Sequence, residues 1–149
     1  MLDDLYSPSI KIKYENLAGD ESVYWPIVRV HLWSNTFSFP QNLIALVDSG
    51  ASHSIIRQDI AQVLGFPVQK LKFDSTGNSV NGTYKSATLS ERVGIDLYGY
   101  KREHKFTVID YSSLIFPIIL GEDSLFKWTT INFNRSKLYF EMRFRTDIN

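Results

Sequence analysis

The stretch "LVDSGASHSII" at residues 46–56 places an aspartate and a glycine inside the most hydrophobic part of the chain. The apolar run "NLIALV" leads into Asp48, and the sequence becomes apolar again within a few residues of it. Asp, Ser and Gly all form turns, so the tripeptide alone favours an ordinary surface turn. A surface turn rarely has such flanks, and an ionised carboxylate is costly to bury unless it is paired or has a chemical role. The context therefore indicates Asp48 as a candidate catalytic residue.

A second stretch, "FPIILGEDSL" at residues 116–125, has the same organisation. An apolar strand breaks at Gly121 and is predicted to pass into a short helix. The glycine-rich segment "STGNSVNG" at residues 75–82 lies between the two stretches. It lacks the G-x-x-x-x-G-K-[ST] pattern and the helix of a phosphate-binding loop, so we expect a hairpin there. Two strand–glycine breaks with a hairpin between them form one constellation.

Alternation with a period of two dominates the rest of the chain and predicts strands over residues 27–33, 92–99 and 137–145. Helix is scarce. The apolar spacing in residues 54–67, which ends at Gly65 and Pro67, predicts one short amphipathic helix, and residues 121–128 predict a second. The sequence indicates one compact, mostly β domain.

Composition restricts the possible partners of the chain. Its 149 residues carry 16 Lys+Arg and 16 Asp+Glu, so no net charge attracts nucleic acid or an anionic membrane. The basic run "YKREHK" at residues 100–105 is interpreted as a solvated hairpin turn. No apolar run approaches the roughly 20 residues of a membrane helix, and the acidic N-terminus does not have the pattern of a secretion signal. We expect a cytoplasmic protein, or one inside virus-like particles if it belongs to a retroelement.

The three histidines do not predict a metal site or a catalytic triad. The chain has no cysteine, and His31, His53 and His104 show no H-x-x-x-H spacing. A triad of Ser52, His53 and Asp48 fails because adjacent side chains on an extended segment point in opposite directions. We therefore expect no metal and no cofactor.

At these residues the sequence resembles the retropepsin family, the single-domain aspartic proteases of retroviruses and retrotransposons. The family motif D-[ST]-G-[AS] is matched by residues 48–51, and "DSGASHSII" is particularly similar to the gypsy-type retrotransposon version. The second family motif falls on Ile119, Leu120, Gly121, Asp123 and Leu125. The segment "STGNSVNG" takes the place of the family's flap, and residues 131–141 resemble the last hairpin of the retrotransposon forms. The retroviral Arg–Asp ion pair is absent, because its positions hold Glu122 and Ser52.

The resemblance, which spans about residues 23–141, implies an all-β fold. This is the single lobe of a retropepsin-like acid protease, a closed, barrel-like sheet with a flap hairpin and one or two short helices. It implies a protease domain over residues 23–145. Residues 1–22 then form an N-terminal extension of unknown role and residues 146–149 a C-terminal tail.

The resemblance also implies an aspartic endopeptidase that acts as a homodimer. Peptide hydrolysis by an activated water needs a base and an acid, and two carboxylates that share one proton supply both. The chain has one D-[ST]-G motif, so each of two chains would contribute Asp48. In the active-site turn formed by Ser49, Gly50 and Ala51, Gly50 allows a close approach of the substrate backbone. By family analogy, Ser49 hydrogen-bonds across the dimer axis.

The substrate implied is an extended peptide or polyprotein, held as an added strand and cleaved between bulky apolar residues. Side chains of a strand alternate between its two faces, so Leu46 lies on the same face as Asp48, two residues further on. Ile119 lies in the same way two residues before Gly121. The expected substrate-binding residues are Leu46, Gly50, Ser52, Ile55, Gly77, Asn78, Ser79 and Ile119. In the second motif, Leu120 and Gly121 are expected to be structural. The alternating side chains Leu138, Phe140, Met142 and Phe144 are predicted to form one apolar face that supports association of two chains.

Three alternatives remain open at the level of the sequence. In the first, the chain is a non-enzymatic module that uses the same fold for dimerisation or peptide binding, although the intact Asp48 argues against this. In the second, it is a cellular protease of ubiquitin-linked or bacterial type that cleaves host proteins. In the third, it is a plain β-sandwich in which the turn is a coincidence.

Overall fold

The structure is a computed structural model and describes residues 5–17, 22–79, 82–110 and 114–148. Most of the secondary structure is β, and the main sheet has nine strands in the order β10-β9-β4-β5-β12-β6-β11-β8-β7. These strands are β4 (Ile27–Trp33), β5 (Leu43–Val47), β6 (Ile55–Ile56), β7 (Ser75–Ser79), β8 (Gly82–Thr88), β9 (Val93–Leu97), β10 (Tyr100–His104), β11 (Thr107–Ile109) and β12 (Ile118–Leu120). The prediction of a mostly β domain is confirmed.

The predicted alternation decides which faces of the strands are buried. In β4, Val28, Val30 and Leu32 are fully buried, whereas Arg29 between them is exposed. The apolar side chains of β9 are also fully buried, and β9 pairs with β4 in antiparallel register. Burial of these side chains removes apolar surface from water, which is the main force that holds the sheet together.

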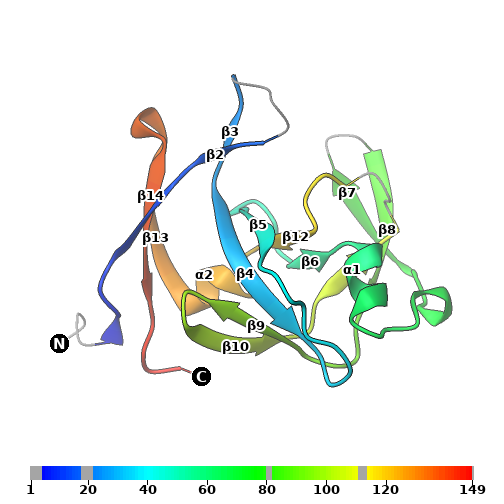
Figure 1. Cartoon of the computed structure of the whole chain (residues 1–149). Helices are drawn as coiled ribbons and strands as arrows, with labels where there is room; N and C mark the ends of the chain where they lie inside the picture. Colours follow the sequence, from blue (N-terminus) through cyan, green and yellow to red (C-terminus); the bar gives the residue numbers. More distant parts are fainter. Residues whose placement is uncertain (1–4, 18–21, 80–81, 111–113, 149) are drawn as a thin grey trace.

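A smaller sheet has the order β1-β14-β13 and contains β1 (Ile10–Lys13), β13 (Thr129–Asn134) and β14 (Tyr139–Phe144). The hairpin of β13 and β14 lies on the opposite side of the molecule from β7 and β8, with β1 beside it (Figure 1). Its predicted apolar face is not free. Phe140, Met142 and Phe144 are fully buried in the core of their own chain, and Leu138 is half-buried. The prediction that this face supports association of two chains is therefore wrong, because the chain's own core already covers it.

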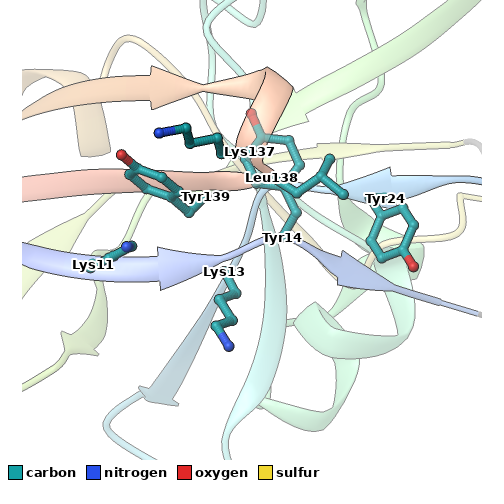
Figure 2. Close-up of a pocket in the computed structure, with 7 residues that line it drawn as sticks. All are labelled: Lys11, Lys13, Tyr14, Tyr24, Lys137, Leu138 and Tyr139. Carbon is teal, nitrogen blue, oxygen red and sulfur yellow. The ribbon is translucent and has the colours of Figure 1, made fainter.

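Residues of the predicted N-terminal extension form part of the fold. Strand β1 pairs with β14, and Tyr14 is buried in the core, in edge contact with Phe140. The short strands β2 (Glu15–Asn16) and β3 (Tyr24–Trp25) form a separate two-stranded sheet. A cavity of about 420 Å³ opens where β1, β3 and the start of β14 meet (Figure 2). Its lining residues are Lys11, Lys13, Tyr14, Tyr24, Lys137, Leu138 and Tyr139.

Both helices are shorter than the sequence predicts. Helix α1 is Gln58–Val63, because Ile55 and Ile56 pair with strands on both sides as β6. The predicted stop is confirmed, since Gly65 follows α1 with φ +99°, a conformation that favours glycine. Helix α2 is only Leu125–Trp128, because residues 121 and 122 form hydrogen bonds with a different part of the chain. No helix of the described residues is long and apolar enough to span a membrane.

The basic run at residues 100–105 is not the turn that we predicted. The turn lies at Tyr98 and Gly99, which have φ values of 54° and 93°. Residues 100–104 form β10, an edge strand that pairs with β9. Two consecutive residues in the left-handed region match the twist of a tight hairpin, so the chain reverses before the basic residues begin.

Candidate active site

The candidate catalytic residue Asp48 follows directly after β5. The register of β5 with the parallel strand β12 brings Val47 opposite Leu120. At the end of this pairing the Asp48 amide donates to the Leu120 carbonyl at 3.0 Å, and the Val47 amide donates to the Pro26 carbonyl at 2.9 Å. The backbone on the N-terminal side of Asp48 is therefore held from two directions.

The turn that follows fixes one oxygen of the Asp48 carboxylate. The Gly50 amide donates to Asp48 Oδ1 at 2.9 Å, and the Ala51 amide donates to the Asp48 carbonyl at 3.2 Å. Asp48 is only half-buried in the single chain, while Ser49 and Gly50 are exposed. The turn thus presents an oriented carboxylate at the surface of the chain.

Hydrogen bonds from the second motif hold this turn and the loop after it in place. The Glu122 amide donates to the Ala51 carbonyl at 2.8 Å, and the Gly121 amide donates to Ser54 Oγ at 2.9 Å. A Cβ atom added to Gly121 would lie 2.3 Å from the Ala51 carbonyl oxygen. Only glycine permits so close an approach of two backbones. The two strand–glycine breaks seen in the sequence therefore form one structural unit.

Three of the predicted substrate-binding residues, Leu46, Ile119 and Ile55, lie in one row across the sheet. Ile119 is opposite Leu46 on β5 and opposite Ile55 on β6. Directly opposed residues of neighbouring strands have their side chains on the same face. Ile55 is buried, and the other two are half-buried. The structure therefore brings these three side chains together close to the turn.

The sequence profile of a family described as aspartyl protease matches residues 41–123, which include the turn and the second motif. The chain belongs to the aspartyl protease family. Family membership makes it an aspartic endopeptidase, so the coincidental turn of a plain β-sandwich is excluded.

Two solved structures show that the protease has the retropepsin-like fold. One is a retropepsin-like aspartic protease from Rickettsia conorii, with a TM-score of 0.60 and 18% identity, which covers 92% of this chain and 91% of that one. The other is EIAV protease in complex with the inhibitor HBY-793, with a TM-score of 0.51 and 20% identity, which covers 74% of this chain and 93% of that one. No curated protein sequence matches the chain significantly.

The predicted flap of the protease is the hairpin of β7 and β8, at the end of the nine-stranded sheet. Its pairing extends to Ser79 opposite Gly82, and residues 80–81 between them lie outside the described residues. The expectation that the hairpin is centred on Gly77 and Asn78 is wrong, because both lie in β7. Gly77 is opposite Tyr84, and a Cβ atom there would lie 2.5 Å from the tyrosine ring. This glycine makes room for a side chain on the neighbouring strand.

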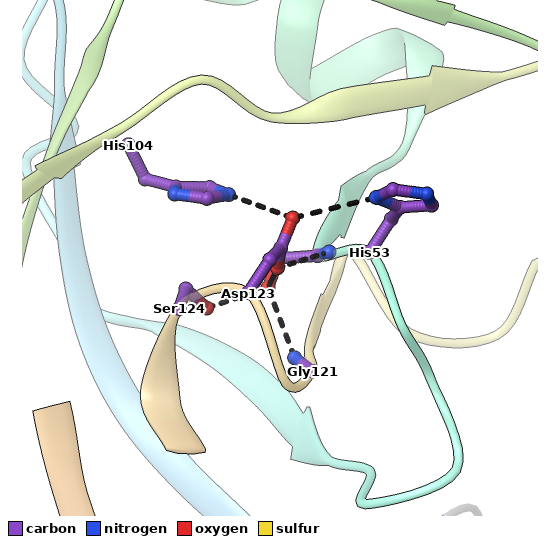
Figure 3. Close-up of polar contacts among 6 residues, drawn as sticks. His53, His104, Gly121, Asp123 and Ser124 are labelled. Carbon is purple, nitrogen blue, oxygen red and sulfur yellow. Dashed lines mark hydrogen bonds and ion pairs between the residues drawn. The ribbon is translucent and has the colours of Figure 1, made fainter. Parts of the chain in front are cut away.

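Sequence reasoning missed a polar cluster behind the turn. The Asp123 carboxylate accepts hydrogen bonds from the Ser54 amide and hydroxyl, and both His53 and His104 approach its other oxygen (Figure 3). The sequence had placed Asp123 in the second motif but had not indicated its partners. Nothing local could have indicated His104, which comes from β10.

The remaining predicted residue, Ser52, is exposed on the loop that follows the turn. Among the described residues, no group of three or more His, Cys, Asp or Glu side chains is arranged to hold a metal ion. Of the nearby acids, Asp59 is paired with Arg57 at 2.6 Å, and this guanidinium holds the pKa of Asp59 below its ordinary value. Asp48 therefore remains the candidate for the chemistry of the turn.

Proposed function

We propose that this protease acts as a homodimer in which each chain contributes one Asp48. The observation that carries the proposal is a single oriented carboxylate on an exposed turn. Hydrolysis by an activated water needs one carboxylate to accept a proton and another to donate one. Asp59 and Asp123 are engaged by Arg57 and Ser54, so neither is available as the second member. A second copy of the turn supplies it.

In the proposed mechanism the two Asp48 carboxylates share one proton, because two negative charges roughly 3 Å apart cannot both persist. The ionised member takes a proton from the attacking water, and the protonated member donates its proton to the carbonyl oxygen of the scissile bond. Collapse of the resulting tetrahedral intermediate then passes a proton to the departing amine. The Gly50 amide, which donates to Asp48 Oδ1, keeps one oxygen of each carboxylate in place during these transfers.

We propose that the substrate is an extended peptide that lies between the flap and the row Leu46–Ile119–Ile55. The half-buried apolar side chains of this row favour apolar side chains next to the cleaved bond. Along the peptide backbone we expect polar contacts from Gly50, Ser52, Gly77, Asn78 and Ser79. A peptide added as a strand gains affinity from its main chain and specificity from alternate side chains.

The biological role that we propose is polyprotein processing in a retroelement, supported by the similarity of "DSGASHSII" to the retrotransposon motif. Regulated cleavage of host proteins is the alternative. A peptide library digested between about pH 4 and 7, the range in which paired carboxylates work, defines the cleaved sequences by mass spectrometry. Cuts between bulky apolar residues are expected. A strong preference for charged residues at the cleaved bond would contradict the role of the apolar row.

Dilution and mixing test the two-chain active site. Specific activity per chain should fall as the protease is diluted through its dimer dissociation constant. Excess Asp48→Asn chains should suppress the wild type, because mixed dimers lack one carboxylate. Asp59→Asn chains are the matched control, since Asp59 lies on α1 and should not inhibit. Constant specific activity at dilutions where sedimentation detects only monomer would overturn the proposal.

A further inference from the structure

The polar cluster behind the catalytic turn joins three segments that are far apart in the sequence. Asp123 belongs to the second motif, Ser54 follows the turn, and His104 ends β10. Asp123 Oδ1 accepts the Ser54 amide at 2.8 Å and the Ser54 hydroxyl at 2.6 Å. Its Oδ2 atom lies 3.2 Å from His104 Nε2 and 3.7 Å from His53 Nδ1 (Figure 3).

The geometry determines which groups donate. An ionised carboxylate only accepts, so His104 makes its contact through a protonated Nε2. Ser54 gives its single hydroxyl proton to Asp123 and accepts the Gly121 amide, so the Ser124 hydroxyl donates to Ser54 Oγ at 2.5 Å. Both serines are fully buried. Each group therefore depends on its neighbour, and the chain of bonds leads from His104 through Asp123 to Ser54, which follows the catalytic turn, and on to the Gly121 amide in the second motif.

His104 lies in a place that disfavours a positive charge. Its side chain is only 15% exposed and contacts the edges or faces of Phe106 and Trp128. Burial lowers the pKa of His104 below its ordinary value, and the cations Lys127 and Arg92 lower it further, while Asp123 acts in the opposite direction. His53, by contrast, is 72% exposed and faces the same carboxylate from the loop after the turn.

We propose that His104 is a positioning residue of this protease: its neutral imidazole holds Asp123 against Ser54, and its protonation in acid loosens the catalytic turn. The activity readout of this proposal rests on the proposed proteolytic function, whereas its structural readouts do not. Protonation strengthens the attraction of His104 to Asp123, but burial and the neighbouring cations oppose it more, so acid favours a move of His104 toward water. His53, which lies in solvent 3.7 Å from Asp123 Oδ2, is the other histidine beside this carboxylate.

The sign of the pH dependence follows from the lowered pKa. As the pH falls below about 6.5, the unfolded chain binds the proton at this histidine before the folded chain does. The stability that neutral His104 contributes is therefore complete above about pH 6.5 and is lost as the pH falls through the lower pKa of the folded state.

The test compares His104→Gln with His104→Phe. Gln offers an amide donor close to the position of Nε2 but does not titrate, whereas Phe keeps the ring and removes the donor. Near neutral pH, we expect the thermal midpoint of His104→Gln to equal that of the wild type. For His104→Phe we expect the folding equilibrium constant to fall about tenfold to a hundredfold, as when one hydrogen bond to a charged group is lost.

Acid conditions should separate the variants further. As the pH is lowered, the wild type should lose stability and activity at a higher pH than His104→Gln does. This holds for the thermal midpoint, the exchange protection of the Ser54 amide and the peptidase activity. His31→Gln is the matched control, because His31 bonds the Ser38 hydroxyl and should leave the wild-type profile unchanged. His53→Gln should shift the profile less than His104→Gln.

Two outcomes would overturn the proposal. One is a pH profile of His104→Gln that superimposes on that of the wild type in both the thermal midpoint and Ser54 exchange. The other is a profile that His53→Gln alone shifts. If no peptide is cleaved by any form, the proposed function fails, but the midpoint and the Ser54 exchange still decide the role of His104.

Discussion

Gly121 and Gly77 show how differently the two glycine-bearing segments of the active site are built. At both positions an added Cβ atom would lie within 2.6 Å of another group, but the groups differ. At Gly121 the obstacle is the Ala51 carbonyl oxygen, which is part of the hydrogen-bonded catalytic turn. At Gly77 it is the ring of Tyr84, a side chain that can rotate. One glycine belongs to a fixed unit and the other to an adjustable one.

The backbone partners of the two segments show the same contrast. The turn around Asp48 is held by bonds to Pro26, Leu120, Glu122 and, through Ser54, Asp123. Strand β7 is the last strand of its sheet and pairs with β8 alone among the described strands. A catalytic carboxylate must be held within fractions of an ångström, whereas a lid must open and close around a peptide. The contacts of the two segments fit the catalytic role and the lid role that we propose for them.

The largest effect is expected at the centre of the fixed unit. Asp48→Asn should lower peptidase activity by about a hundredfold to ten-thousandfold, because Asn cannot exchange the proton of the dyad. The thermal midpoint should change little, since Asn keeps an oxygen that accepts the Gly50 amide. A peptide assay and thermal unfolding of both proteins measure the two effects. Asp59→Asn controls for the loss of a carboxylate, and equal activity in Asp48→Asn and the wild type would remove Asp48 from the mechanism.

Gly121→Ala should be the next most damaging change. Its Cβ would force the second motif and the turn apart, at a cost of about 1–3 kcal/mol in the free energy of unfolding. Activity should fall as well, because the Ala51 backbone would move with the turn. Chemical denaturation followed by a peptide assay measures both. A variant of wild-type stability would show that the turn is adjustable and would remove the contrast with the flap.

Gly77→Ala is the matched change in the flap and should have a smaller effect. The Tyr84 ring can rotate away, so the cost in unfolding free energy should stay below about 1 kcal/mol, as for most surface substitutions. We expect the altered flap to raise KM more than it lowers kcat. Steady-state kinetics beside the same denaturation experiment test this. A stability loss equal to that of Gly121→Ala would mean that the flap is as fixed as the turn.

The smallest effect concerns motion rather than chemistry. Hydrogen exchange across β7 and β8 should slow when a peptide inhibitor binds, because the flap then gains a partner strand. The amides of Gly50, Ala51 and Glu122 should show little change, since their hydrogen bonds exist already. Flap exchange that stays the same despite proven binding would argue against a lid.

The sequence and the structure agree best where local signals are strong. The apolar flanks of Asp48, the break at Gly121 and the alternation in β4, β9 and β14 predicted the strands and the turn from neighbouring residues alone. The row of Leu46, Ile119 and Ile55 was predicted in part from strand alternation, because side chains of a strand alternate between its two faces. The first predicted helix was too long, because Ile56 has the spacing of a helix but finds, together with Ile55, strand partners on both sides.

By itself, the sequence determined the candidate catalytic residue Asp48, the mostly β class and the pair of glycine breaks, since these depend on local pattern. Only the tertiary structure decided that the apolar face of β14 serves the chain's own core, that the flap turns beyond Gly77, and that His104 reaches Asp123. Each of these depends on which strands pair and in what register, and pairing joins residues that no local pattern connects. The fixed turn is therefore visible in the sequence, whereas the cluster behind it exists only once β10, the turn and the second motif come together.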